Sequence, residues 1–354
     1  MAVTSSSGTP ARSAPQGPAP SRARRGGSGL GVLKRFLTLR EGSIIVVLVI
    51  TVIYFASTTS KFVSGSNFKT LLPYFAPIAI MAAGQVFVMT LGEIDLSIGA
   101  MYLFTPFLYY KLNKAGIPIV PSMLISLLVA LALGAFNGFA VAYIGIASFV
   151  ATLGMLFVLD GVTLVISHSE QVTTPGTTIV GVTTFAQIFG EGTYSELIWA
   201  LAIVFGLQIL LSFTRWGLYT VAAGGNRLGA SEAGVNVRLV LIRNFMLCAL
   251  TAGFVGILEA VRSSSASPDP SGSNAILFEA ISAVIIGGTL MTGGAGTVVG
   301  ALLGALFLGI LNDGLVIKGV NANYLDLYLG IAILIAMTIN VYVNRVRIGS
   351  GRGG

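Results

Sequence analysis

The chain has 354 residues, of which 55% are hydrophobic and only 9% are charged. A soluble domain carries about 25% charged residues, because its surface must face water. The composition therefore excludes soluble enzymes, nucleic-acid-binding proteins and disordered proteins, and it predicts a polytopic membrane protein. The net charge of +7 is typical of membrane proteins with cationic cytoplasmic loops, so we expect the lipid bilayer, and no nucleic acid, as its environment.

The sequence holds little of the chemistry that catalysis requires. It contains one cysteine, Cys248, and one histidine, His168. A disulfide framework needs paired cysteines, and thiolate or imidazole metal sites need several ligands. No paired catalytic motif and no Walker A sequence occurs. We therefore expect no metal, no cofactor and no enzymatic activity in this chain, and any nucleotide energy must come from a partner.

The first segment differs from the rest in composition. Residues 1–40 are rich in Ala, Pro, Ser and Gly, carry seven Lys or Arg and contain no acidic residue. Such a segment buries too little apolar surface to offset the entropy lost on ordering. We predict a disordered, basic cytoplasmic tail over 1–40, a transmembrane domain over 41–345 and a short cytoplasmic tail over 346–354.

Apolar segments then recur at lengths close to the roughly 20 residues that a helix needs to cross the hydrocarbon. They predict an all-α bundle of about ten transmembrane helices. The predicted spans are 43–58, 71–91, 96–112, 121–143, 146–167, 196–214, 239–261, 276–292, 297–317 and 324–343.

The distribution of basic residues predicts the orientation of these spans. Fourteen of the 20 Lys and Arg residues lie in the N-terminal segment, after the last span, or in the loop after the sixth span. The segment from Ser169 to Thr214 has three acids and no Lys or Arg. By the positive-inside rule, both termini are cytoplasmic. Four lysines in predicted outer loops count against this orientation: Lys61, Lys69, Lys111 and Lys114.

A short internal similarity suggests a repeat. Residues 130–137 and 305–312 are identical at five of eight positions, and in each copy a glycine precedes an asparagine by three residues. In the predicted topology the two segments run in opposite directions, as in the inverted repeats of many transporters. A chance match of common membrane residues is the alternative.

The sequence Gly92-Glu93-Ile94-Asp95-Leu96-Ser97-Ile98-Gly99 interrupts an apolar stretch that runs from about 71 to 109. One helix of that length would be nearly twice the hydrocarbon thickness, so the chain must turn or break here. Asp95 or Ser97 is suited to cap the following helix. The motif predicts either a broken helix that lines a polar path or an ordinary cytoplasmic turn.

Two further segments are rich in glycine. The loop 224–236 has a helix-compatible centre between glycines, which predicts either a short docking helix or a solvated connector. The turn within 287–296 follows an apolar helix, and its small residues favour close helix packing over phosphate binding.

Isolated polar residues lie inside several spans, where burial in hydrocarbon is costly unless they face a cavity or a partner. Gln85, Asn137 and Asn312 either form hydrogen bonds between helices or line a path. Together with the 92–99 motif they give our candidate substrate pathway, formed by Gln85, Glu93, Asp95, Ser97, Asn137 and Asn312.

Five segments in order resemble the permeases of bacterial ribose- and xylose-type ABC importers. They are GEIDLSIG at 92–99, SFVATLGMLFVLDG at 148–161, GGNRLGASEAGVN at 224–236, EAISAVIIGGTLMTGGAG at 279–296 and GALLGALFLGILNDG at 300–314. The resemblance covers roughly residues 40–345.

The resemblance implies a multi-pass protein of the bacterial plasma membrane that imports a monosaccharide or polyol. It implies an ATP-binding cassette subunit, an extracytoplasmic sugar-binding protein and a second permease copy as partners. It also implies that the loop 224–236 couples the permease to the ATPase through Gly225, Asn226, Ala230, Ser231, Glu232, Gly234 and Asn236. The binding protein largely selects the sugar, so the permease sequence does not name it.

Three positions depart from the family pattern. Asp160 stands where a basic residue is expected, which leaves its role open. Glu93 is acidic where many ribose-type relatives have a small residue, which favours the xylose-like branch. Arg227 and Leu228 replace a more polar pair, so the ATPase surface that meets them is expected to differ.

An ion-coupled secondary transporter is the alternative function. It would need intramembrane carboxylates that carry protons or sodium ions. Glu93, Asp95 and Asp160 are the candidates in this sequence.

Overall fold

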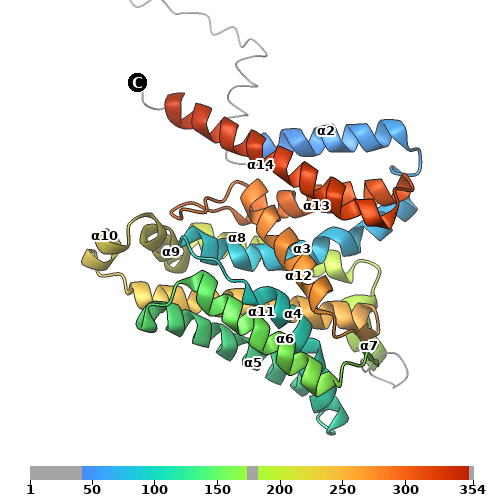
Figure 1. The fold of residues 1–354 in the computed structure, drawn as a ribbon, viewed down its shortest axis with the longest axis horizontal. Helices are drawn as coiled ribbons and strands as arrows, with labels where there is room; N and C mark the ends of the chain where they lie inside the picture. The colour runs from blue at the N-terminus through green and yellow to red at the C-terminus, as the bar shows by residue number, and fades with distance from the viewer. Residues whose placement is uncertain (1–41, 174–181, 351–354) are drawn as a thin grey trace, which may run out of the picture.

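The computed structural model describes residues 42–173 and 182–350, so the predicted tail over 1–40 lies outside the described residues. A long helix overlaps each predicted span, and these helices run mostly from left to right in Figure 1. They are α2 (Gly42–Thr58), α3 (Gly65–Thr90), α4 (Ser97–Lys114), α5 (Ile119–Phe139), α6 (Ser148–Ser167), α8 (Ser195–Phe213), α11 (Val237–Arg262), α12 (Pro270–Ile286), α13 (Val298–Ile317) and α14 (Leu325–Ser350).

Shorter elements join them. They are the π-helical segments η1 (Ala140–Ile144) and η2 (Gln187–Glu191), the 3-10 turn η3 (Ala322–Tyr324), and the short helices α7 (Val182–Ala186), α9 (Arg215–Gly225) and α10 (Arg227–Glu232). The strands β1 (Val172–Thr173) and β2 (Ser265–Ala266) form one antiparallel pair, with Val172 opposite Ala266.

In the described part of the chain, six helices are long and apolar enough to cross a membrane: α3, α5 with η1, α6, α8, α11 and α13. The helical membrane protein predicted from composition is thus confirmed, while the count of ten crossings stays a prediction. Helix α4 is less apolar than these six helices, because it carries lysines and tyrosines near its end.

The eighth span was predicted too far along the chain. Its helix, α12, begins at Pro270 and ends at Ile286, so residues 287–292 lie outside it. Asp269 caps the start by accepting a hydrogen bond from the amide of Ser271, and proline is favoured in the first turn of a helix. Gly287 and Gly288 end the helix, and Gly288 adopts a φ of 94°. Helix α9 was not predicted at all.

Helix α3 is the centre of the bundle. It packs against α8, α11, α12 and α13, and nearly every residue from Leu71 to Thr90 is buried. A helix that is apolar on all sides is stable only when protein or lipid surrounds it. Here the neighbouring helices, rather than lipid, enclose most of α3.

Glycine allows several helices to approach backbone to backbone. A methyl group on Gly134 of α5 would lie 2.6 Å from the carbonyl oxygen of Phe245 and 2.7 Å from the Cβ of Ala249, both on α11. Lipid provides no hydrophobic drive for helix association, so such van der Waals packing carries it instead.

The two ends of the described chain lie at one end of the bundle. The start of α2 and the end of α14 face the left of Figure 1, where α9 and α10 also lie, and α7 lies at the right. An even number of crossings gives this arrangement. The placement of that end in the cytoplasm stays a prediction.

The packing partners of the two similar segments are related. Helix α5, which carries Gly134, packs on α11, and α13, which carries Gly309, packs on α3. The ten long helices divide into a first set of five (α2 to α6) and a second set of five (α8 and α11 to α14). In each set the fourth helix, α5 or α13, packs on the second helix of the other set, α11 or α3. The inverted repeat stays a prediction, and this relation supports it.

We expect Gly134→Ala to destabilise the bundle by about 1–3 kcal/mol, because the added methyl group overpacks the contact between α5 and α11. Thermal unfolding of the purified chain in detergent measures the effect. Gly154→Ala on α6 is the control, because nothing lies within 4 Å of the added methyl group there. Equal melting temperatures for the two variants would contradict the packing described here.

Candidate functional site

The turn between α3 and α4 is built around Asp95. Its side chain is fully buried. The Oδ1 atom accepts hydrogen bonds from the Ser97 amide at 2.9 Å and from the Ser97 Oγ at 2.6 Å. The carboxylate therefore satisfies the first amide of α4, as the sequence predicted, and it fixes the direction in which α4 leaves the turn. The predicted break in the apolar stretch is confirmed.

Ser97 connects this turn to α5. Its Oγ accepts a hydrogen bond from Asn137 Nδ2 at 2.9 Å, and Asn137 is 1% exposed. Asp95, Ser97 and Asn137, which the sequence proposed separately, thus form one buried hydrogen-bond chain. It joins α4 to α5 at the inner end of the predicted bundle.

Two hydroxyls on α6 hold the irregular backbone of the turn. Ser148 Oγ accepts a hydrogen bond from the Ile94 amide at 3.2 Å, and Thr152 Oγ1 accepts one from the Leu96 amide at 3.0 Å. Buried backbone amides outside regular helices require such partners. The sequence analysis missed both residues. Their spacing of four residues on an apolar helix was the available signal.

Gln85 and Asn312 lie apart from this chain. Gln85 is fully buried on α3, and its Oε1 accepts a hydrogen bond from Cys248 Sγ on α11 at 3.0 Å. Asn312 lies on α13 and is partly exposed. Among the described residues, no hydrogen bond joins either of them to Asp95, and their place in a substrate pathway stays a prediction.

Three glycine-containing segments meet beside this turn, and we call their contact the glycine junction: Thr90–Gly92, Gly224–Gly225 and Thr292–Gly294. The Gly294 amide donates to the carbonyl oxygen of Thr90 at 2.8 Å. A methyl group on Gly224 would lie 1.8 Å from that same oxygen, and one on Gly293 would lie 2.8 Å from the Gly92 nitrogen. No side chain fits between these backbones, which explains the glycines.

The loop 224–236 contains a short helix, α10, as its glycine-flanked centre predicted, while docking of this helix on a partner stays a prediction. Asn226 caps α10 by accepting from the Gly229 amide at 3.0 Å, and Asn236 caps α11 in the same way through Leu239 at 3.0 Å. Ala230 lies on the buried side of α10, and Gly234 after it adopts a φ of 84°. These residues hold the loop in shape.

The remaining residues of α10 face outward. Leu228, Ser231 and Glu232 are exposed, and Leu228 exposes 70% of its surface. Side chains exposed in this way are accessible to a partner protein. The predicted coupling residues therefore divide into those that shape α10 and those that are free to contact a partner.

Two of the departures from the family pattern contact each other. Arg227 on α10 forms an ion pair with Glu93, and its Nη2 also donates to the Leu91 carbonyl oxygen at 3.2 Å. The ion pair links α10 directly to the turn that Asp95 organises. Sequence spacing alone gives no indication of this pairing, because 134 residues separate the partners.

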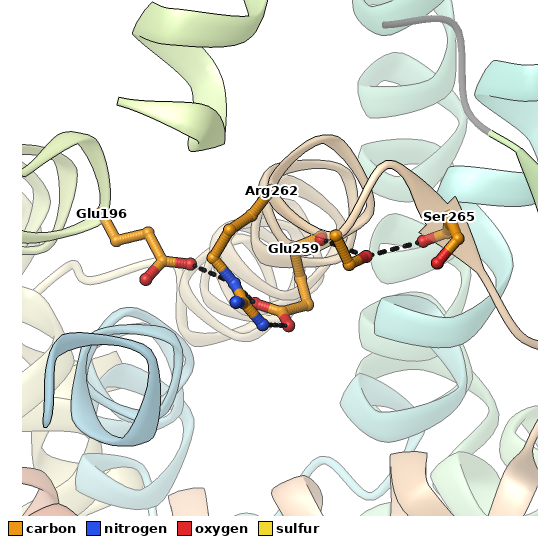
Figure 2. A network of polar contacts seen from close by, with 5 residues as sticks. Glu196, Glu259, Arg262 and Ser265 are labelled. Atoms are coloured by element: carbon orange, nitrogen blue, oxygen red, sulfur yellow. Dashed lines mark hydrogen bonds and ion pairs between the residues drawn. The ribbon is translucent and has the colours of Figure 1, made fainter. Parts of the chain in front are cut away.

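A second charged cluster lies at the opposite end of α11. Arg262 Nε lies 3.0 Å from Glu196 Oε1 on α8, and the same nitrogen donates to Glu259 Oε2 at 3.0 Å (Figure 2). The sequence analysis missed this cluster. Glu259 and Glu196 therefore share one guanidinium.

Comparison with known proteins identifies the chain. Residues 67–337 match the family described as "Branched-chain amino acid transport system / permease component". The chain belongs to this permease family. The resemblance seen in its motifs is thus confirmed.

Relatives extend over most of the permease. The xylose/arabinose import permease protein of Sulfolobus acidocaldarius is 36% identical over 89% of this chain and 88% of that protein. The ribose import permease protein of Escherichia coli K12 is 32% identical over 87% of this chain and 96% of that protein. A probable ABC transporter permease protein of the same organism is 30% identical over 88% and 93%. No solved structure is significantly similar.

We expect Asp95→Ala to cost about 1–3 kcal/mol, because it leaves a buried amide and hydroxyl of Ser97 without an acceptor. Asp95→Asn should cost less, since its amide oxygen can still accept. Hydrogen exchange at the Ser97 amide and thermal unfolding measure the effect. Asp326→Ala, at an exposed carboxylate on α14, is the control. Slower or unchanged exchange in Asp95→Ala would show that the carboxylate does not hold the turn.

Proposed function

We propose that this permease is the membrane subunit of an ATP-binding-cassette importer for a neutral monosaccharide or polyol of the ribose and xylose class. A xylose/arabinose import permease and a ribose import permease are similar to most of the chain, which supports the substrate class. The single observation that carries the mechanism is that exposed α10 begins two residues after the glycine junction, in which the end of α9 contacts the turns before α4 and before α13. Arg227 of α10 also contacts the turn before α4 directly, through Glu93 and Leu91.

The proposed mechanism is alternating access driven from outside the membrane domain. A separate ATPase subunit binds α10 through Leu228, Ser231 and Glu232, and its closure displaces α10. The junction transmits this displacement to α4 and to α12 and α13, because its backbones touch without compliant side chains between them. The central path then changes the side to which it opens.

The remaining parts of the assembly follow from the same proposal. The permease has ten crossings in a bacterial plasma membrane, with both termini and α10 in the cytoplasm. An extracytoplasmic sugar-binding protein delivers the substrate at the opposite end. A second permease copy, identical or paralogous, completes the translocation path with the candidate residues Gln85, Ser97, Asn137 and Asn312.

Reconstitution tests the energy source. We expect proteoliposomes that hold the permease with its ATPase, and the binding protein on the substrate side, to take up D-xylose or D-ribose only with ATP. The permease alone should take up neither sugar. An ionophore should leave ATP-driven uptake unchanged. Uptake by the permease alone on an imposed ion gradient would contradict the proposal and favour the ion-coupled alternative.

Charge reversal tests the role of the ion pair between α10 and the turn. Arg227→Glu should lower the sugar transported per ATP hydrolysed about fivefold, which corresponds to roughly 1 kcal/mol for a partly exposed pair. Glu93→Arg combined with Arg227→Glu should restore much of it, since the double variant rebuilds the pair.

The matched control is Arg215→Glu on α9, an exposed arginine in the same cytoplasmic region. It makes the same charge change without touching Glu93, so coupling should stay at the wild-type level. Equal loss in Arg215→Glu, or no recovery in the double variant, would assign the effect to surface charge rather than to the pair.

A further inference from the structure

A cavity of about 270 Å³ opens between α4, α11 and α12. It lies at the end of α11 remote from α10, and the 26 residues of α11 span about 39 Å at 1.5 Å per residue. In the predicted topology this end faces the outside. Its walls include hydroxyls, two carboxylates and one partly exposed aromatic ring, contributed by Tyr102, Glu259, Ser263, Ser265, Ser267 and Asp269.

The charges around the cavity disfavour anions. Glu259 and Asp269 line it, and no Lys or Arg lies in the wall formed by the described residues. Arg262 stands behind Glu259, and Figure 2 shows its guanidinium held between the carboxylates of Glu196 and Glu259. A ligand carboxylate or phosphate would therefore meet two acids and no free cation.

The same wall suits a neutral, polyhydroxylated ligand. Serine hydroxyls both donate and accept hydrogen bonds, and carboxylates accept from ligand hydroxyls with charge assistance. A volume of about 270 Å³ is small for a ligand site, which matches a single sugar ring. A free amino acid fits poorly, because its carboxylate would have no partner. The family description includes amino-acid transport, and the acidic wall of this cavity favours a sugar over an amino acid as the ligand.

The floor of the cavity adjoins the turn organised by Asp95. Ser273 lines the cavity, and a methyl group on Gly99 would lie 2.7 Å from the Ser273 carbonyl oxygen. Gly99 is two residues from Ser97 on the same helix. A shift of α4 therefore changes the cavity and the Asp95 turn together.

We propose that this cavity is an outward-opening binding site for a neutral monosaccharide within one permease protomer. The inference rests on the proposed function and gives the permease a sugar site of its own, at which Asp269 and the serine hydroxyls bind the ligand. In this arrangement, displacement of α4 from the α10 side alters the shape of the occupied site.

Cysteine labelling in intact cells tests the site, with the full chain produced together with its transport partners. Ser267→Cys places a thiol at an exposed wall position, and the native Cys248 is fully buried. A membrane-impermeant maleimide should modify it, and millimolar D-xylose or D-ribose should slow the reaction, whereas L-leucine should not. Ser60→Cys, in the exposed loop after α2, should be labelled at a rate that no sugar changes.

A second substitution tests the role of the wall carboxylate. Asp269→Asn keeps an oxygen that can cap α12 but removes the charge. Combined with Ser267→Cys, it should raise the sugar concentration needed for half-protection about tenfold, since charge-assisted hydrogen bonds are roughly twice as strong as neutral ones.

The outcomes separate this site from the proposed function. Absence of labelling at Ser267→Cys, or labelling that both sugars leave unchanged in cells that take up those sugars, would overturn the site while the importer function stands. Protection by L-leucine and by neither sugar would overturn both the sugar site and the sugar class. Protection that survives Asp269→Asn without change would overturn the assignment of the carboxylate.

Discussion

The contact at the glycine junction is the constraint on which the rest of this permease depends. Three backbones from distant parts of the sequence approach so closely that a single methyl group would collide with a carbonyl oxygen or an amide. Close-packed protein is poorly compressible and transmits displacement. The end of α9, from which α10 follows directly, therefore cannot move independently of the turns before α4 and before α13. In the proposed mechanism, this makes one exposed helix sufficient to act on two membrane elements.

Several polar side chains near the junction take part in internal hydrogen bonds. Ser97 binds both Asp95 and Asn137, and α6 supplies hydroxyls for the backbone between α3 and α4. A solute that passes this level must compete with those bonds or use other groups. The cavity at the far end offers hydroxyls and a carboxylate in a wall that opens outward. Helix α4 is thus held by hydrogen bonds at its start, and its middle turns, at Tyr102 to Phe107, line the cavity.

The sequence predicted those features that local chemistry determines. Apolar length located the long helices, two carboxylates marked the break before α4, and an acid next to a helix start predicted the cap by Asp95. Glycines on both sides of 228–233 predicted α10. Each of these signals lies within a few residues of the structure that it indicates.

Features formed by distant pairs could not be predicted in this way. The Glu93–Arg227 ion pair joins residues that are 134 positions apart, and the Glu196–Arg262 pair joins α8 to α11. Three glycine-rich motifs gave no sign that they meet, because glycine indicates close approach without indicating to what. Ser148 could not be assigned from sequence, because a hydroxyl at a helix start resembles an ordinary cap, whereas its partner, the Ile94 amide, lies 54 residues earlier.

The enclosure of α3 has a consequence for biogenesis. Most of the helices that enclose α3 follow it by more than a hundred residues. They are α8, α11, α12 and α13. While the ribosome is still making them, α3 with its buried Gln85 and two prolines must wait in contact with lipid or with the insertion machinery. Helix α3 is thus synthesised early but is among the last helices to reach its final surroundings, and nascent chains that stop before α13 expose it to quality control.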